Sequence, residues 1–302
     1  TIKWGITGSD TIGKGIGSYV KYDPAYIYNS GMQTFEILKS PQVVELIYST
    51  SNAMQNAANA HKSDDEDIAD DALDKAGLFQ FCSFPQIDYD FTKACSLDLT
   101  MADHDFITDH ILKAKACQGT LLRWLVDNPQ TTLPEEFEHL RNCHLPEELA
   151  YLQDLAQRFA DFMYMVHVRY NYIYSGYQDE EVLEKFKQLL DAYRNSGTDM
   201  DTVLAAVNIR ENSGKWFCKE IAQHIAAGET EENGLLDQTI INRERRVKGS
   251  RRKIGNPAYK YDKKNRIHYY KLTYRWETVR QFMEELKAAS PHSTMGKEVT
   301  NG

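Results

Sequence analysis

The sequence predicts a mainly α protein with a small α+β part at its N-terminus and a multi-helix lobe around one long central helix. Three observations predict this class. Apolar residues recur at helical spacing from residue 99 onward, glycine and proline divide that region into helix-length segments, and residues 1–62 mix a strand-like segment with a glycine-dense loop. With 302 residues, 42% of them hydrophobic and 26% charged, the chain can bury a globular core.

The small α+β part is assigned to residues 1–62. Residues 2–7 resemble a short strand that runs into a loop, and Pro41 suits the first turn of a later helix. The loop sequence GSDTIGKG, residues 8–15, is similar to the phosphate-binding pattern GxxxxGK(S/T), but Gly15 replaces the hydroxyl residue that would bind magnesium. An ordinary loop is therefore favoured over a nucleotide site.

Residues 63–98 are predicted to form an acidic linker region. Seven acids fall within residues 63–75 with almost no apolar residues, a composition that favours a solvated segment over a core element. At the other end of the chain, residues 291–302 are predicted to form a disordered tail.

The helical lobe is predicted to span residues 99–228. Thr100 suits the N-cap of its first helix, with Asp103 completing a variant of the capping box. The long central helix should begin at the Pro146 turn, where two glutamates follow, and end before Gly176. Shorter helices are expected at residues 121–126, 180–194, 200–210 and 215–227.

Residues 229–290 are predicted to contain a basic helix, a short hairpin-like segment and a closing amphipathic helix. Gly249 and the Gly255-Asn256-Pro257 sequence mark a turn after the basic helix. The sequence RIHYYKLT, residues 266–273, alternates like a strand, and residues 276–286 have helical amphipathic spacing.

The charge of the chain is unevenly distributed. Residues 242–280 contain fourteen basic and three acidic residues, a net charge of +11, whereas the whole chain has a net charge of −9. The rest of the chain is therefore strongly acidic, and we call residues 242–280 the basic strip.

The basic strip predicts a surface for nucleic acid. Its cations are too dense to be neutralised by the local acid Glu244, and the tyrosines that follow could stack on bases while the cations neutralise phosphates. Two alternatives stay open, namely docking of the strip on the chain's own acidic surface, including residues 64–74, and binding to an acidic protein partner. The candidate nucleic-acid-binding residues are Arg243, Arg245, Arg246, Lys248, Arg251, Arg252, Lys253, Lys260, Arg266, Tyr269, Lys271 and Arg275.

Two other groups of polar residues have weaker functional interpretations. The sequence DHDFITDH, residues 103–110, crowds potential metal ligands, but its two histidines are six positions apart rather than four, so a solvated helix face is favoured. On the long helix, a polar row could supply an acid or base, although a packing network is the preferred interpretation. This row comprises Asp161, Tyr164, His167, Asn171 and Tyr174.

Composition argues against several classes of protein. The five cysteines are scattered and include no CxxC pair, which indicates reduced thiols rather than a disulfide framework or a thiolate zinc site. No apolar run is long enough to span a membrane and no signal peptide opens the chain, so a cytoplasmic protein without membrane partners is expected. No bound metal or cofactor is predicted.

Several segments resemble the bacterial family catalogued as domain of unknown function 6361. These are GITG, YIYNSGMQTFEI, SLDLTMADHDFITDHIL, RFADFMYMVHVRYNYIY, INRERRVKGSRRKIGNP and LTYRW. The resemblance implies that residues 248–253 and the Tyr274-Arg275-Trp276 turn belong to a recurrent pattern. It also implies a charged region before Thr1 and a place among bacterial defence or mobile-element genes. No catalytic residue follows from it.

The leading prediction is a non-enzymatic or accessory nucleic-acid-binding protein. The first alternative is a metal-dependent hydrolase or nuclease, using His104, Asp105, Asp109 and His110, or His167 with Asp161. The second alternative is a helical scaffold whose basic strip binds another protein.

Overall fold

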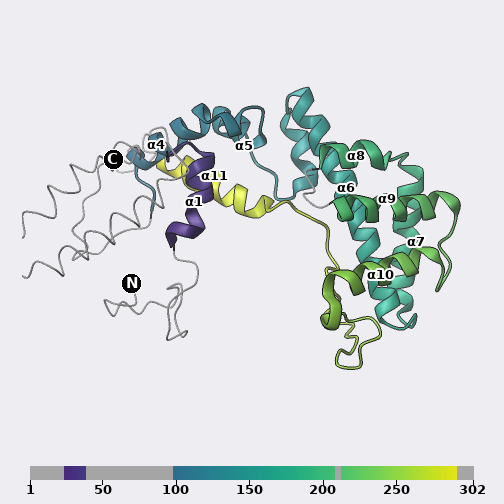
Figure 1. Cartoon of the computed structure of the whole chain (residues 1–302). Coiled ribbons are helices and arrows are strands. Elements are labelled where there is room, and N and C mark those ends of the chain that lie inside the picture. Colours follow the sequence, from purple (N-terminus) through teal and green to yellow (C-terminus); the bar gives the residue numbers. More distant parts are fainter. Residues whose placement is uncertain (1–23, 39–97, 208–211, 291–302) are drawn as a thin grey trace, which may run out of the picture. The chain divides into compact units, whose positions relative to one another are not determined.

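The computed structural model describes residues 24–38, 98–207 and 212–290, and these ranges are helical with irregular connections (Figure 1). No β-strand occurs in these ranges, so the mainly helical class is confirmed for them. Most of the predicted α+β part, the glycine-dense loop, the acidic linker region before residue 98 and the tail at residues 291–302 lie outside the described residues.

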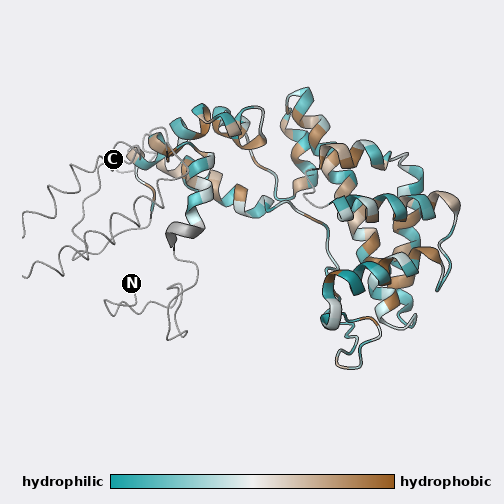
Figure 2. Ribbon diagram, in the orientation of Figure 1, coloured by the Kyte–Doolittle hydropathy of each residue, from teal (hydrophilic) through white to brown (hydrophobic). Residues whose placement is uncertain are grey.

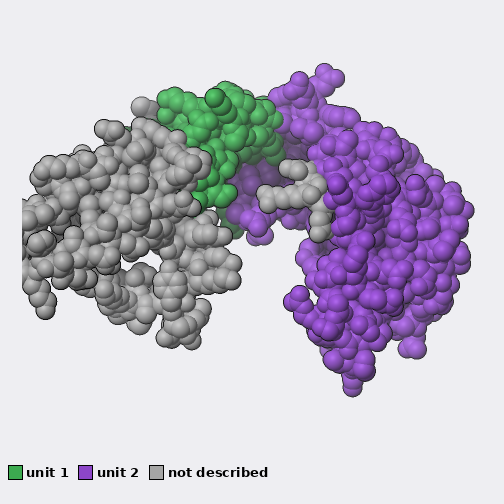
Figure 3. Space-filling model, viewed as in Figure 1, with its two compact units in different colours: residues 1–130, 281–302 green, residues 131–280 purple. Residues whose placement is uncertain are grey.

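The chain divides into two compact units, which Figure 3 shows in different colours. One unit comprises residues 1–130 with residues 281–302, and the other comprises residues 131–280. This division falls inside the predicted lobe of residues 99–228, because the helices before residue 130 belong to the first unit. Each unit is described below by itself.

The described helices of the first unit confirm the predicted cap at Thr100. Its side chain accepts a hydrogen bond from the Asp103 amide (3.2 Å), and the Asp103 carboxylate accepts one from the Thr100 amide (2.9 Å). Two long-range hydrogen bonds join residues 35–36 to residues 110–115. The Lys115 amide donates to the Glu36 side chain, and the His110 ring contacts the Phe35 carbonyl. The helices are α1 (Pro24–Thr34), α4 (Met101–Lys113), η3 (Lys115–Cys117) and α5 (Leu121–Asp127).

The second unit is built around α6 (Glu147–Tyr174), which confirms the predicted long central helix and both of its ends. Two glutamates occupy its first turn, where the positive end of the helix dipole favours acids. The other helices are η4 (Phe137–Cys143), α7 (Glu180–Asn195), α8 (Met200–Ala206), α9 (Asn212–Ala227), α10 (Leu235–Lys248) and η5 (Gly249–Arg251). The closing helix α11 (Trp276–Ala289) begins in this unit and continues in the first one.

The core of the second unit lies between α6 and the helices packed against it, and Figure 2 shows their hydrophobic residues in brown. On α7, Val182, Phe186 and Leu190 recur every four residues and are all buried, which is the one-sided pattern of an amphipathic helix. The side chains that α6 adds to this core include Phe162, which is fully buried. Burial of such a side chain stabilises the fold by about 1.5–3 kcal/mol.

A buried ion pair joins α6 to α10. The Arg169 guanidinium donates to both oxygens of Asp237, at 2.6 and 3.0 Å, and these two side chains are 2% and 0% exposed. Arg169 also donates to the carbonyls of Thr230 and Glu231, in the loop between α9 and α10. One arginine therefore fixes both α10 and the loop that leads to it.

The prediction of a strand at residues 266–273, and with it of a hairpin-like segment after Gly255, is wrong, because these residues form an extended and turning chain without strand pairing. Alternate residues of the segment instead face α6. The Ile267 amide donates to Asn171 (2.8 Å), Tyr269 packs edge-on against Tyr164, and Lys271 pairs with Asp161. The alternation reflects docking on a helix, which leaves Ile267, Tyr269 and Lys271 half-buried and His268 and Tyr270 exposed.

Among the residues that the structure describes, no helix is both long enough and apolar enough to cross a bilayer.

Candidate functional site

The basic strip separates into two parts with different surroundings. We call its first part the basic edge, which consists of the end of α10 and the turn after it. The residues of the basic edge are Arg245, Arg246, Lys248, Arg251, Arg252 and Lys253. The second part, residues 260–275, follows α6 in the opposite chain direction, from Tyr174 near one end to Ala156 near the other.

Glu244 organises the basic edge. Its carboxylate accepts hydrogen bonds from the Tyr170 hydroxyl (2.6 Å) and from the amides of Lys253 (2.8 Å) and Ile254 (3.1 Å). These bonds close the turn after α10 back onto the helix, so the cations of the turn lie beside those of the helix. Burial and the contact with Glu244 raise the pKa of the Tyr170 hydroxyl above its ordinary value, so this hydroxyl stays a donor.

Four cations of the basic edge face solvent, and Arg252 and Lys253 are half-buried. Arg245, Arg246, Lys248 and Arg251 are exposed, and in the part of the chain that the structure describes no ion pair joins the basic edge to an acid. The C-terminal end of a helix favours cations by about 0.3–1 kcal/mol each, but like charges three or four positions apart repel one another. The cluster is therefore a concentration of charge that a bound anion would stabilise.

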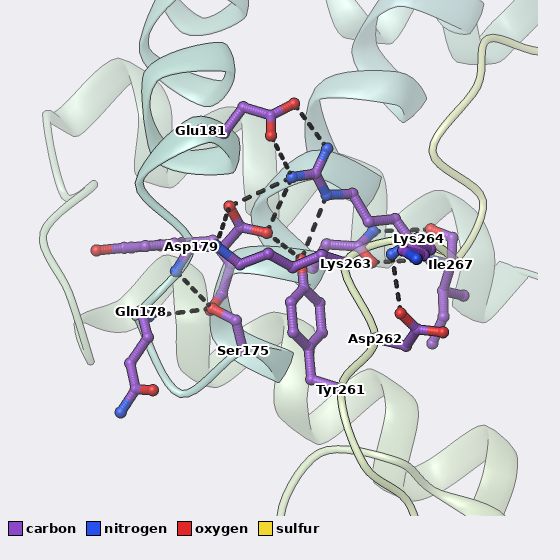
Figure 4. Close-up of polar contacts among 12 residues, drawn as sticks. Ser175, Gln178, Asp179, Glu181, Tyr261, Asp262, Lys263, Lys264 and Ile267 are labelled. Carbon is purple, nitrogen blue, oxygen red and sulfur yellow. Dashed lines mark hydrogen bonds and ion pairs between the residues drawn. The ribbon is translucent and has the colours of Figure 1, made fainter.

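Several cations in the second part of the strip are neutralised by acids of their own chain, and Figure 4 shows the contacts around Asp179, Glu181 and Tyr261. Arg266 donates to Asp179 (3.0 Å) and to Glu181 (2.8 Å), and the Tyr261 hydroxyl donates to Asp179 (2.5 Å). Asp179 is completely buried. Its own amide, together with that of Gln178, donates to the hydroxyl of Ser175, the C-cap residue of α6. The turn between α6 and α7 thus holds the carboxylate in place.

The pKa values of this cluster follow from these contacts. Burial by itself would raise the pKa of Asp179, but hydrogen bonds from Tyr261 and Arg266 hold it below the ordinary value. Burial and the bond to Asp179 raise the pKa of Tyr261 to about 12. Asp179 therefore remains a carboxylate and Tyr261 remains a donor throughout the neutral pH range.

Lys271 and Tyr269 are also engaged within the chain. The Lys271 ammonium pairs with Asp161 at 2.8 Å and with Glu138 at 3.3 Å. The Tyr269 ring lies against Tyr164, and the Arg266 guanidinium lies 4.9 Å from its centroid. Self-docking thus occurs for this half of the strip, although on different acids from the predicted residues 64–74, which lie outside the described residues.

The polar row of α6 and the second part of the strip are therefore partners of each other. Asn171 donates to the Ile267 carbonyl and accepts from its amide, both at 2.8 Å, and the Tyr174 hydroxyl donates to the Lys260 carbonyl. His167 lies 5.3 Å from the His268 ring, centroid to centroid. The packing network is the interpretation that these contacts support, because each member of the row touches this segment.

His167 gives a pH-dependent prediction. Burial and the neighbouring His268 lower its pKa from 6.5 to about 4, so the unfolded chain takes up this proton at a higher pH than the folded chain does. The His167 contribution to stability is thus complete above pH 6.5 and is lost as the pH falls towards 4. Chemical denaturation across this pH window should show that the free energy of unfolding falls less for His167→Gln than for the wild type. Equal losses would contradict the prediction.

The remaining candidate residues of the strip occupy different settings. Arg243 is half-buried, donates to Ser213 (3.0 Å) and lies over the Phe217 ring. Lys260 is exposed. Arg275 is also exposed and lies, like Tyr274, in the left-handed region, with φ values of 57° and 53°. Tyr274 is held there by a hydrogen bond to the Ala156 carbonyl (2.6 Å), so the implied Tyr274-Arg275-Trp276 turn is the bend that leads into α11.

The potential metal ligands of residues 103–110 have separate partners. Asp103 caps the helix, His104 contacts Asp105, and Asp109 pairs with Lys113 on the next turn. His110 points instead to the Phe35 carbonyl. In the described ranges, the cluster with metal-ligand geometry is a different one, Glu136, Glu138 and His139, and its Glu138 is already paired with Lys271.

A cavity of about 620 Å³ lies between α6, α9 and α10, beside the basic edge. Its apolar wall comes from α6 and α9, and includes Phe159, Met163 and Phe217. Its cationic wall comes from α10 and the turn after it, and consists of Arg243, Lys248, Arg251 and Lys253. Neither this cavity nor the role of Glu244 was predicted from the sequence. The isolated acid in a basic segment was the available signal for the latter.

Comparison with family models, curated protein sequences and solved structures gave no match to this chain. The resemblance to domain of unknown function 6361 therefore stays a hypothesis, and no residue role is taken from another protein.

Proposed function

We propose that this protein binds nucleic acid through its basic edge. The observation that carries the proposal is the set of exposed cations, Arg245, Arg246, Lys248 and Arg251. Hydrogen bonds from the turn after α10 to the Glu244 carboxylate of α10 hold them together. Such a cluster repels itself in the free protein, and a row of phosphates would relieve that repulsion while releasing counterions.

The proposed contact surface is narrower than the basic strip. Arg266, Tyr269 and Lys271 are left out, because their charged groups or rings are already used within the chain. Lys260 and the exposed ring of Tyr259 stay as candidates for additional contacts, since they follow the turn of the basic edge. A place in a bacterial defence or mobile-element locus is compatible with such a role and rests on the resemblance alone.

The test is a salt-titrated binding panel of single- and double-stranded DNA and RNA. The affinity of the wild-type protein should fall steeply with salt, with a log–log slope of about 0.7–0.9 per neutralised phosphate. The variant Arg245→Gln/Arg246→Gln/Arg251→Gln should bind more weakly, and its slope should be smaller by roughly 2 to 3, since it loses three phosphate contacts.

A matched variant distinguishes the effect of the basic edge on binding from the effect of net charge. Lys185→Gln/Lys187→Gln/Arg194→Gln removes the same charge from α7 and should leave the slope within about 0.5 of the wild-type value. Equal weakening by both triple variants would show that only net charge matters, and the proposal would fail. It would also fail if polyglutamate of matched charge bound as tightly as the oligonucleotides, because that result would favour an acidic protein partner.

A further inference from the structure

We infer that the cavity beside the basic edge receives one unstacked base of a single-stranded nucleic acid. The inference deepens the proposed function and rests on it, because the same cations would hold the neighbouring phosphates. The volume of about 620 Å³ lies within the range of roughly 300–1,000 Å³ that is usual for ligand pockets.

The two walls of the cavity select the chemistry of its ligand. Aromatic and aliphatic side chains of α6 and α9 form one wall, with Phe159, Phe217 and the His167 ring among them. Lys248, Arg251 and Lys253 form the other wall. A ligand that satisfies both walls has a flat apolar body directly linked to an anion, and a nucleotide has this arrangement.

The carboxylate in the cavity lining does not oppose an anion as strongly as its charge suggests. Glu244 accepts hydrogen bonds at both oxygens, from Tyr170, Lys253 and Ile254. Four cations line the same cavity, including Arg243, whose guanidinium lies 5.8 Å from the centroid of the Phe217 ring. The net charge of the lining is thus positive.

A strand of nucleotides fits these features better than an isolated amphiphilic anion. Lys248, Arg251 and Lys253 belong both to the cavity and to the basic edge, which continues to the exposed Arg245 and Arg246. A ligand with one apolar group inside the cavity therefore needs further anions outside it. A single strand can turn one base inward at little cost, whereas a duplex must first unpair and unstack that base.

The test compares oligothymidylate with an abasic oligonucleotide of the same length, which carries the same phosphates without bases. The wild-type protein should bind oligothymidylate at least about fivefold more tightly, since a stacked base strengthens binding by this factor or more. Both ligands should show the same salt slope, because their phosphate contacts are equal. At matched salt, the single strand should also bind more tightly than a duplex of the same length.

The role of the cavity is tested by a variant that blocks it and by a control with the same ring outside it. Val247 lines the cavity and is 52% exposed, so Val247→Trp should fill the entrance without disturbing the core. Gln238→Trp puts the same ring on the opposite face of α10, nine residues earlier, at an exposed position outside the cavity lining. The preference for oligothymidylate should disappear in Val247→Trp and persist in Gln238→Trp. Phe217→Leu, which removes a ring from the apolar wall, should reduce the preference as well.

Two results would overturn the inference. One is equal binding of the two oligonucleotides by the wild-type protein, and the other is identical behaviour of the Val247→Trp and Gln238→Trp variants. If the triple variant of the basic edge still weakened binding in either case, the proposed function would stand and only the role of the cavity would be lost.

Discussion

Replacing Arg169 with methionine is expected to lower the free energy of unfolding of the unit formed by residues 131–280 by about 3–5 kcal/mol. The change leaves the Asp237 carboxylate, which is 0% exposed, without its cation. It also leaves the carbonyls of Thr230 and Glu231 without the donor they share. Tyr177 and the Asn233 amide would still donate to Asp237, but neither carries a positive charge.

Chemical denaturation measures this loss as a shift of the unfolding midpoint. Arg158→Met is the control, because Arg158 lies on the same helix but is solvent-accessible. It pairs with Asp154 at the surface, where such pairs contribute about 0–1 kcal/mol, and makes two longer bonds of 3.3 Å to the Ser196 carbonyl and the Thr198 hydroxyl. The double variant Arg169→Met/Asp237→Leu should be less destabilised than the sum of its single changes, since neither charge is left alone. Similar midpoints for Arg169→Met and Arg158→Met would contradict the buried-pair argument.

Replacing Asp179 with asparagine is expected to release residues 260–271 from α6 while the helices of the unit stay folded. The change removes the charge that accepts hydrogen bonds from Tyr261 and Arg266, and hydrogen bonds to charged groups contribute about 1.5–3 kcal/mol each. Arg266 would keep its exposed partner Glu181, so we expect a loss of about 3 kcal/mol in the local opening free energy rather than global unfolding.

Hydrogen exchange of the backbone amides measures this opening directly. The Ile267 amide, which donates to Asn171, should exchange about a hundredfold faster in Asp179→Asn, as expected for a change of about 3 kcal/mol. Asp262→Asn is the control, because Asp262 lies in the same segment but accepts only local bonds from Lys264 and Asn265. Unchanged exchange at Ile267 in Asp179→Asn would show that the segment is held by its apolar contacts instead.

The helices could be predicted from the sequence because their signals are local. Thr100 and Asp103 form their capping box within one turn, and the buried residues of α7 recur at fixed spacing. The start of α6 after Pro146 and its end before Gly176 depend on neighbouring residues only.

The strand prediction failed for a physical reason. Alternation of side chains indicates an extended chain with one covered face, and residues 267–271 alternate between half-buried and exposed positions. Alternation carries no information about what covers the buried face. Here Asn171 and Tyr164 of α6 cover it, about a hundred residues away in the chain. The acidic partners of Arg266 and Lys271 could not be predicted for the same reason, since they are similarly distant in the chain.

The sequence by itself determined the main helices after residue 99, the long central α6 among them, and the concentration of positive charge between residues 242 and 280, because propensity, spacing and charge are properties of short segments. It did not predict the helix α1 at residues 24–34. Only the tertiary structure decided which cations are neutralised. Asp179 and Asp161 face Arg266 and Lys271, whereas the cations around Arg246 meet solvent beside a cavity. The physical reason is that an ion pair depends on distances of a few ångströms, which are set by the packing of α6, α7 and α10 and not by position along the chain.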